Sequence, residues 1–297
     1  VERGGGRRSA GRESVMSISS ASEDETSEAG EDECPVSEEW LDAMLSSYHE
    51  GQAKVASYMV RAGCDQGESV LSDILAVDVD YALQPDTTLQ SLSLIIKLLP
   101  QDPFSRFFVT EAQFDLREIK FYTKVVPELK KFQTEYLPPD TPHIELPIPK
   151  CFHARYSTDS DTITQSVLVL ENLKTKGYTG CEFGRGLTLK QTQSALEAVA
   201  SLHALSLALK VKQGTPLDER YPFLFQTARA SDSYQQLVER GLPQLAHFLE
   251  KRPGLEPILE SLNSLRPNTK DIIAALLAPE EPLALITHTD FWCNNLL

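Results

Sequence analysis

The residues whose types and spacing could do chemistry lie at the end of the 297-residue chain, in the segment 286–297. There His288, Asp290 and Asn295 form the pattern H-x-D-x-x-x-x-N, with apolar residues on both sides. In phosphoryl transfer, an aspartate in this pattern accepts the proton of the attacking hydroxyl, and the asparagine oxygen ligates Mg²⁺ bound to the nucleotide phosphates. The pattern therefore predicts a phosphotransferase loop. The alternative is a polar turn between two buried strands.

The eight residues from His288 to Asn295 resemble the motif His-Gly-Asp-Leu-Trp-x-Asn-Asn of the ecdysteroid kinase-like (CHK kinase-like) family. Choline kinases and aminoglycoside phosphotransferases are relatives of that family. The resemblance implies transfer of a phosphoryl group from ATP to a hydroxyl of a small molecule, an ecdysteroid-like or other small alcohol. It also implies ATP and Mg²⁺ as cofactors, with Asp290 as catalytic base and orienter and Asn295 as metal ligand. His288 is expected to brace the loop.

Two further charged residues fall on elements that could position them. Residues 89–99 alternate as a strand with Ile95 and Lys97 on one face, and a helix expected over 110–136 carries Glu118 on an apolar stripe. A lone carboxylate on such a stripe is costly unless it is paired. Lys97 is the natural partner, because a kinase needs the strand lysine that holds the nucleotide phosphates to be held by a helix glutamate. The alternatives are a snorkelling lysine and a glutamate at the helix edge in water.

Other segments resemble the family in the same order along the chain. Residues Gly67 to Ser72 resemble its glycine turn Gly-Glu-Asn-x-x-Ser, with Ser69 in place of the asparagine. This implies that Gly67 and Ser72 contact the nucleotide. The run Val-Leu-Glu-Asn-Leu resembles the inter-lobe hinge, which implies that main-chain groups of Glu171 and Leu173 hydrogen-bond adenine.

A capping box at Thr188 predicts the start of a helix whose apolar stripe, from Leu189 to Leu207, is wide enough to be buried. His203 on this helix lies in Leu-His-Ala-Leu-Ser, which also resembles a family segment. We interpret His203 as a buried, hydrogen-bonded structural histidine rather than a catalytic one.

Composition narrows the class of protein. The net charge of −15 at pH 7 argues against a nucleic acid or an anionic membrane surface as the partner. No apolar run is long enough to predict a membrane span, and the N-terminal segment lacks the apolar core of a signal peptide. The five cysteines are scattered without a C-x-x-C pair, which is typical of a reducing compartment. A cytoplasmic protein with a small-molecule substrate is therefore expected.

Together these features predict an α+β, two-lobed, protein kinase-like fold. Residues 1–35, which are rich in Asp and Glu, are expected to be a disordered acidic tail. A mixed β-sheet N-lobe is expected over 36–170, a hinge at 171–173 and a mainly helical C-lobe over 174–297.

Within this fold, Ser37 is the expected N-cap of the first helix, and Gly51 is expected to break or kink that helix before Val55. Pro100 and Pro103 are expected to break the chain. Two more helices are expected over 237–249 and 255–265.

The chain departs from the family pattern in two places. Thr289 replaces the family's glycine, and a branched residue would strain a turn that needs a positive φ. The family's second metal-binding aspartate lies beyond this loop, so we expect the C-lobe to be incomplete at its C-terminus and the chain as written to be inactive. The main alternative is a nucleotide-binding pseudokinase that acts as an interaction module. A helical scaffold that binds no nucleotide is a third possibility.

Overall fold

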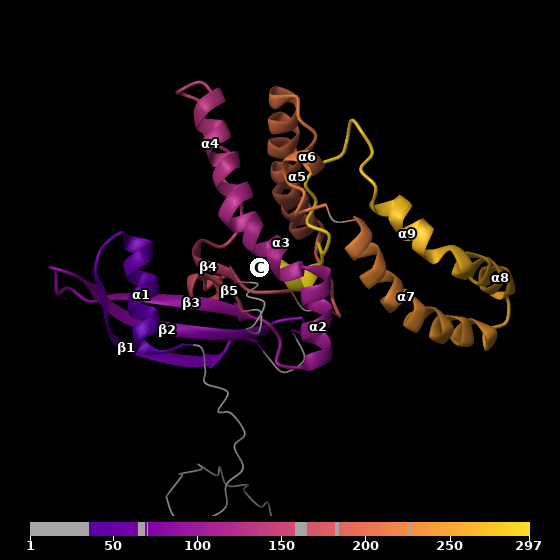
Figure 1. Ribbon diagram of the computed structural model, residues 1–297, viewed down its shortest axis with the longest axis horizontal. Helices are drawn as coiled ribbons and strands as arrows, with labels where there is room; N and C mark the ends of the chain where they lie inside the picture. Colours follow the sequence, from indigo (N-terminus) through magenta and orange to yellow (C-terminus); the bar gives the residue numbers. More distant parts are fainter. Residues whose placement is uncertain (1–35, 65–68, 70, 158–164, 182–183, 226) are drawn as a thin grey trace, which may run out of the picture. The chain divides into compact units, whose positions relative to one another are not determined.

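The computed structural model describes residues 36–64, 69, 71–157, 165–181, 184–225 and 227–297 (Figure 1). The predicted acidic tail and Gly67 lie outside these residues. The helices are α1 (Glu38–His49), α2 (Pro103–Ala112), α3 (Phe114–Lys120), α4 (Val126–Tyr136), α5 (Leu189–Gln213), α6 (Leu217–Arg220), α7 (Thr227–Glu250), α8 (Glu256–Leu265) and α9 (Thr269–Leu277). The strands are β1 (Ala53–Ala62), β2 (Asp73–Leu83), β3 (Gln90–Leu98), β4 (Cys151–Ser157) and β5 (Gln165–Glu171).

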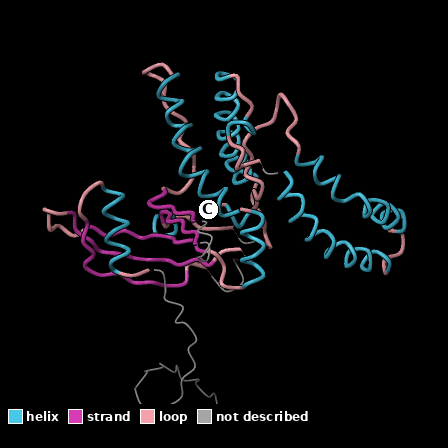
Figure 2. The backbone as a smooth tube through the Cα atoms, in the orientation of Figure 1, coloured by secondary structure: helices cyan, strands magenta, loops and turns pink. Residues whose placement is uncertain are grey.

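The strands form one sheet in the order β1-β2-β3-β5-β4, drawn in magenta in Figure 2. The sheet is antiparallel rather than mixed, because each of the pairings between these strands is antiparallel. The register places Lys97 opposite Ile74 and Ile95 opposite Ala76. Since side chains alternate between the faces of a strand, these four residues share one face of the sheet. The predicted α+β class is confirmed, while the predicted lobe limits stay a prediction.

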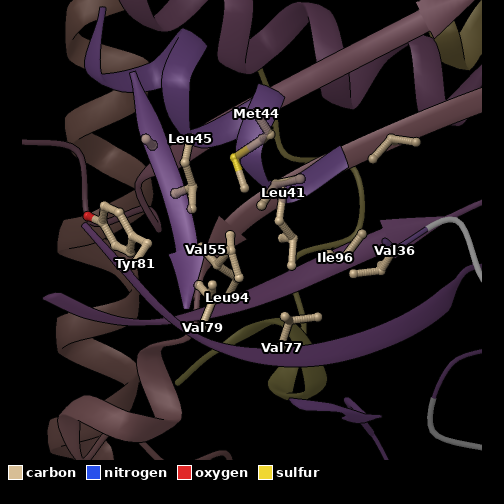
Figure 3. Packing of buried hydrophobic residues seen from close by; sticks show 13 residues of the cluster. Val36, Leu41, Met44, Leu45, Val55, Val77, Val79, Tyr81, Leu94 and Ile96 are labelled. Atoms are coloured by element: carbon tan, nitrogen blue, oxygen red, sulfur yellow. The ribbon is translucent and has the colours of Figure 1, made fainter. Parts of the chain in front are cut away.

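The opposite face of the sheet carries the hydrophobic core that α1 covers (Figure 3). Leu41 and Leu45 of α1 pack onto Val77 and Leu94, and all four are completely buried. Burial of a side chain of this size contributes roughly 1.5–3 kcal/mol. The predicted cap is confirmed, because the Ser37 side chain accepts a hydrogen bond from Trp40 N at 3.2 Å.

The first helix does not continue beyond Gly51. Glu50 adopts the left-handed conformation with φ 51°, which ends α1. Ser46 Oγ then accepts a hydrogen bond from Ala53 N at 2.9 Å and directs the chain into β1. The segment from Val55 onward is therefore a strand, and the possibility of a kinked helix there was wrong.

The single helix expected over 110–136 is also wrong in its limits. Helix α2 begins at Pro103, which is tolerated in the first turn, and Asp102 caps it by accepting from Ser105 N at 2.7 Å. Gln113 then takes a left-handed φ of 54° and separates α2 from α3. A π-helical turn, Phe121–Val125, joins α3 to α4. Residues 110–136 thus form two continuous helical stretches, the end of α2 and the run from α3 to α4, which are separated at Gln113.

Helix α5 is only partly buried. The predicted capping box is present at Thr188, but the apolar stripe is exposed in its first half, where Leu189 is 76% and Leu196 57% exposed. The second half packs Leu202, Leu205 and Leu209 into a core shared with α4 (Leu202, Leu205, Leu209, Val125, Leu129, Phe132, Leu217, Tyr221, Ile286). Among the described residues, α5 is the one helix long and apolar enough to cross a membrane by length and composition, a test that core helices also pass. The expectation that its stripe is buried throughout was wrong.

Helices were also expected over 237–249 and 255–265. The structure has them as α7 and α8, and α7 begins earlier than predicted.

Candidate functional site

Lys97 and Glu118 form an ion pair between β3 and α3. Lys97 Nζ donates to both carboxylate oxygens of Glu118, each at 2.7 Å. The pairing holds because α3 packs on the same face of the sheet as Lys97, through a cluster of Ile119, Leu168 and Leu170. The lysine and glutamate side chains are 27% and 38% exposed, so water reaches the pair from one side. The expectation that these two residues pair is confirmed.

The titratable groups Tyr122 and Cys151 lie close to Glu118 and have raised pKa values. Burial raises the pKa of the Tyr122 hydroxyl well above its usual range, and the negative charge of Glu118 adds to this. Burial likewise raises the pKa of the Cys151 thiol to about 11. Both groups are therefore neutral at physiological pH, so Lys97 is the charge that balances Glu118 at this position.

The predicted hinge leaves two main-chain groups free. The Glu171 N–H donates to the Lys150 carbonyl at 2.8 Å, and the Leu173 carbonyl accepts from Tyr178 N at 3.3 Å. In the described part of the chain, no main-chain group pairs with the Glu171 carbonyl or the Leu173 N–H. One acceptor and one donor two residues apart can pair with the edge of a purine base. Lys176 holds the pKa of the Glu171 carboxyl below its usual value through a hydrogen bond, with a smaller contribution from Lys150.

A cavity of about 290 Å³ lies against this hinge. Ala76 and Ile95 line it from the face of the sheet that carries Lys97, and Asn172 and Thr175 line it from the hinge. Its remaining lining residues are Arg61, Ala62, Gly63 and Lys174. The volume is at the lower end for small-molecule pockets, about 300–1,000 Å³.

Gly63 closes one end of the cavity because β2 approaches it closely. Its N–H donates to the Ile74 carbonyl at 2.8 Å. A Cβ added to Gly63 would lie 2.6 Å from Ile74 Cγ2 and 3.0 Å from the main chain of Leu75. A side chain at this position would therefore push β1 and β2 apart.

The segment 288–295 brings Asp290 and Asn295 together. Asn295 Nδ2 donates to the Asp290 carboxylate at 2.8 Å and to the Asp290 carbonyl at 2.9 Å. This orientation leaves the amide oxygen of Asn295 for a cation. Thr289 adopts φ 63°, so the positive φ expected where the family has glycine is present. No strand is assigned to the described residues 278–287 that lead into this loop, and most of its side chains are exposed.

The predicted site residues therefore form separate groups. Among the described residues, hydrogen bonds join Lys97 to Glu118 and Asp290 to Asn295, and none joins one pair to the other. Ser72 lies just before β2, where its carbonyl accepts from Ser69 Oγ at 2.7 Å. Gly67 lies outside the described residues.

Sequence reasoning missed the residues that line the cavity. The alternation of β3 places Ile95 on the face of Lys97, and this pattern could have identified it. Asn172 differs, because its role depends on contacts across the sheet. Its Nδ2 donates to Ser93 Oγ at 3.0 Å, and Ser93 Oγ donates to Asp78 at 2.5 Å. Asp78 in turn pairs with Arg61. This chain links the hinge to β1 and has no local sequence signal.

His203 is half-buried, and its Nε2 is a buried atom that has no hydrogen-bond partner among the described residues. The expectation of a hydrogen-bonded histidine was therefore wrong for this atom. The hydroxyl of Ser206 instead donates to the His203 carbonyl at 3.0 Å.

The residues present fit a nucleotide at the hinge better than they fit a metal at the loop. The hinge carbonyl and N–H and the apolar side chains of Ala76 and Ile95 suit a purine, and Lys97 provides one cation for phosphates. The described residues contain no group of three or more His, Cys, Asp or Glu side chains that could hold a metal ion. Of the loop residues, Asn295 would hold Mg²⁺ through its amide oxygen, and Mg²⁺ commonly keeps several waters and uses few protein ligands.

Comparison with known proteins identifies one family. No curated protein and no solved structure matches the chain. A model of the ecdysteroid kinase-like family matches residues 66–297, which include Lys97, Glu118, the hinge and the 288–295 loop. Such a family suggests a kinase-like phosphotransferase and agrees with the α+β architecture. The chain therefore belongs to the ecdysteroid kinase-like family.

Proposed function

We propose that this protein is an ATP-dependent phosphotransferase that acts on a hydroxyl of a small molecule, an ecdysteroid-like or other small alcohol. The observation that carries the proposal is the bidentate Lys97–Glu118 pair, on the same face of the sheet as a cavity at the hinge. A strand lysine held by a helix glutamate next to a base-sized cavity is the arrangement that nucleotide phosphates require.

In this proposal each group has a defined role. The Glu171 carbonyl and the Leu173 N–H bind the adenine edge, and Ala76 and Ile95 contact its faces. Lys97 binds the phosphates, and Glu118 keeps the ammonium in place. Gly67 and Ser72, which lie between β1 and β2 along the chain, contact the phosphates.

The acceptor side is assigned to the 288–295 loop. Asp290 orients the acceptor hydroxyl and takes its proton, and Asn295 holds Mg²⁺ through its amide oxygen. Bound Mg²⁺ and ATP supply the phosphoryl group and neutralise the charge that develops during its transfer. We further propose a cytoplasmic location and neither nucleic acid nor membrane as partner, on the basis of the scattered cysteines and the net charge of −15. Fractionation of cells that express a tagged chain would test the location.

The experiment is a turnover assay of the full-length protein with Mg-ATP and a panel of steroid and other small alcohols, with and without the Asp290→Asn change. We expect ADP release that depends on one class of alcohol and a phosphorylated product detected by mass spectrometry. The substituted protein should bind Mg-ATP normally and release little ADP. Absence of both ATP binding and turnover in the unchanged protein would contradict the proposal and leave a scaffold that binds no nucleotide as the remaining alternative.

A pseudokinase is the second candidate, and Thr289 is the observation that favours it. A β-branched residue with φ 63° is strained, and the strain lies next to Asp290. A chain that binds Mg-ATP but turns over no acceptor would indicate this function. Thr289→Gly, which removes the strain, would then be tested for gain of turnover.

A further inference from the structure

The segment that leads into the 288–295 loop is attached to α5 through a buried lysine. Lys210 is 8% exposed, and its ammonium donates to the Glu281 carboxylate at 2.7 Å, the Pro282 carbonyl at 2.7 Å and the Ala284 carbonyl at 2.9 Å. An ammonium group has three N–H donors, so this set satisfies it completely. All three acceptors lie in residues 281–284, which are 71 to 74 positions away along the chain.

A second contact continues the attachment toward the loop. Ser206, which is completely buried, lies one helical turn before Lys210 on the same face of α5. Its hydroxyl accepts a hydrogen bond from Ile286 N at 3.4 Å. Ile286 is 7% exposed and belongs to the core formed with α4 and α5. The chain is thus held from residue 281 to residue 286.

The chain beyond this attachment has little burial of its own. The side chains of residues 287–292 are exposed, and the Asn295–Asp290 hydrogen bonds are local to the loop. Contacts on its other side include that of Cys181 Sγ, which is 3.8 Å from the Cys293 carbonyl. The position of Asp290 therefore depends in part on where Ile286 is fixed.

We propose that Lys210 is a positioning residue for the Asp290–Asn295 loop. It contacts no reacting group in the proposed reaction and acts by fixing residues 281–286 on α5. Burial of an ammonium group costs free energy unless well-placed hydrogen-bond acceptors surround it. The three acceptors that satisfy Lys210 are two carbonyls and one carboxylate of the segment that leads to the loop. The consequence for catalysis rests on the proposed function, whereas the attachment itself does not.

The attachment is tested by amide hydrogen exchange of the full chain. We expect Lys210→Met to increase exchange at Ile286 and Asn295 by about 10-fold or more, because several hydrogen bonds to a charged group are lost. The matched control is Lys212→Met, which removes the same charge from the same helix at an exposed position. Unchanged exchange across 281–297 in Lys210→Met would overturn the proposal.

Lys210→Arg keeps the experiment decisive if the methionine variant does not fold. Arginine retains the charge, but its planar fork cannot direct three donors to three convergent acceptors. The exchange rate of Lys210→Arg at Ile286 and Asn295 should therefore lie between the rates of the unchanged chain and of Lys210→Met. If Lys210→Met is unfolded, the rate of Lys210→Arg should still exceed that of the unchanged chain. Glu281→Gln, which leaves both carbonyl acceptors, should have a small effect. The proposal would be overturned if Lys210→Arg exchanged as slowly as the unchanged chain while Lys212→Met exchanged faster than Lys210→Arg.

The catalytic consequence is measured as kcat and KM for ATP with an acceptor that the unchanged chain phosphorylates. We expect kcat of Lys210→Met to fall by about 10²-fold, the usual effect of a displacement of about 1 Å, while KM for ATP changes little. If Lys210→Met merely lowered the stability of the whole protein, the fraction of active molecules would fall without a selective effect on kcat. In that case Lys210→Arg would not show an intermediate kcat. Faster exchange with unchanged kcat would overturn the positioning role. If the unchanged chain phosphorylates nothing, the proposed function fails, and hydrogen exchange alone decides the attachment.

Discussion

Substitution of Lys97 or of Glu118 should weaken Mg-ATP binding, and the effect of the double substitution should differ from the sum of the two. Lys97→Ala removes the cation that would bind the phosphates and leaves Glu118 without its partner. Glu118→Gln keeps the lysine but weakens the interaction that holds it, so its effect should be smaller. The double variant should lose about as much as Lys97→Ala alone, because Glu118 acts through Lys97.

The magnitude follows from the geometry and the exposure of the pair. Both oxygens lie 2.7 Å from Nζ, but the side chains are 27% and 38% exposed, so the pair is neither buried nor fully solvated. Exposed pairs contribute about 0.2–1 kcal/mol, and breaking a buried pair costs about 3–5 kcal/mol. We expect a coupling free energy of about 1–2 kcal/mol, between these limits. At about 1.4 kcal/mol per tenfold, this corresponds to roughly 5- to 30-fold in the dissociation constant.

Isothermal titration calorimetry with a non-hydrolysable ATP analogue and Mg²⁺ measures this coupling. The control is the Lys54–Glu38 pair, which has the same 2.7 Å separation but is 57% and 50% exposed and joins β1 to α1. Lys54→Ala and Glu38→Gln should leave the affinity unchanged. Effects at Lys97 and Glu118 that add to within about 0.5 kcal/mol would refute the reasoning. Equal losses in the control pair would refute it as well.

Three further predictions concern the loop and the tail. Asp290→Asn should lower kcat by about 10²–10⁴-fold with unchanged ATP affinity, because the base is lost and the shape is kept, and a turnover assay near full rate would contradict this. Thr289→Gly should raise the free energy of unfolding by about 0.5–1 kcal/mol, since φ 63° is strained for threonine, and urea unfolding that shows no gain would remove the argument from strain. Deletion of residues 1–35 should leave the melting temperature nearly unchanged, because the described core begins at Val36, and a clear decrease by calorimetry would show that the tail contributes to stability.

Local pattern and chemistry were sufficient for much of the fold. The alternation in β3, the cap at Ser37 and the capping box at Thr188 each depend on residues a few positions apart, and the structure contains all of them. The Lys97–Glu118 pair was also predictable. A lone carboxylate on an apolar helix face needs a cation, and the order of elements offered Lys97 on the neighbouring strand.

The failures share a different origin. The break at Gln113 and the exposure of Leu189 and Leu196 depend on which surfaces α2, α3 and α5 pack against, and propensity does not contain this information. The cavity is another case, because its walls combine residues 61–63, Ala76, Ile95 and the hinge.

The sequence by itself therefore determined the types and order of many of the elements, because these follow from short-range periodicity. It supplied the candidate site residues through the chemistry of their side chains and through the resemblance to the family. Only the tertiary structure decided that Lys210 is buried against residues 281–284 and that no main-chain group of the described residues pairs with the Glu171 carbonyl or the Leu173 N–H. Burial of a charge and pairing of a main-chain group are properties of the surroundings, and the partners concerned are more than 70 residues away for Lys210. No local pattern encodes contacts at that separation.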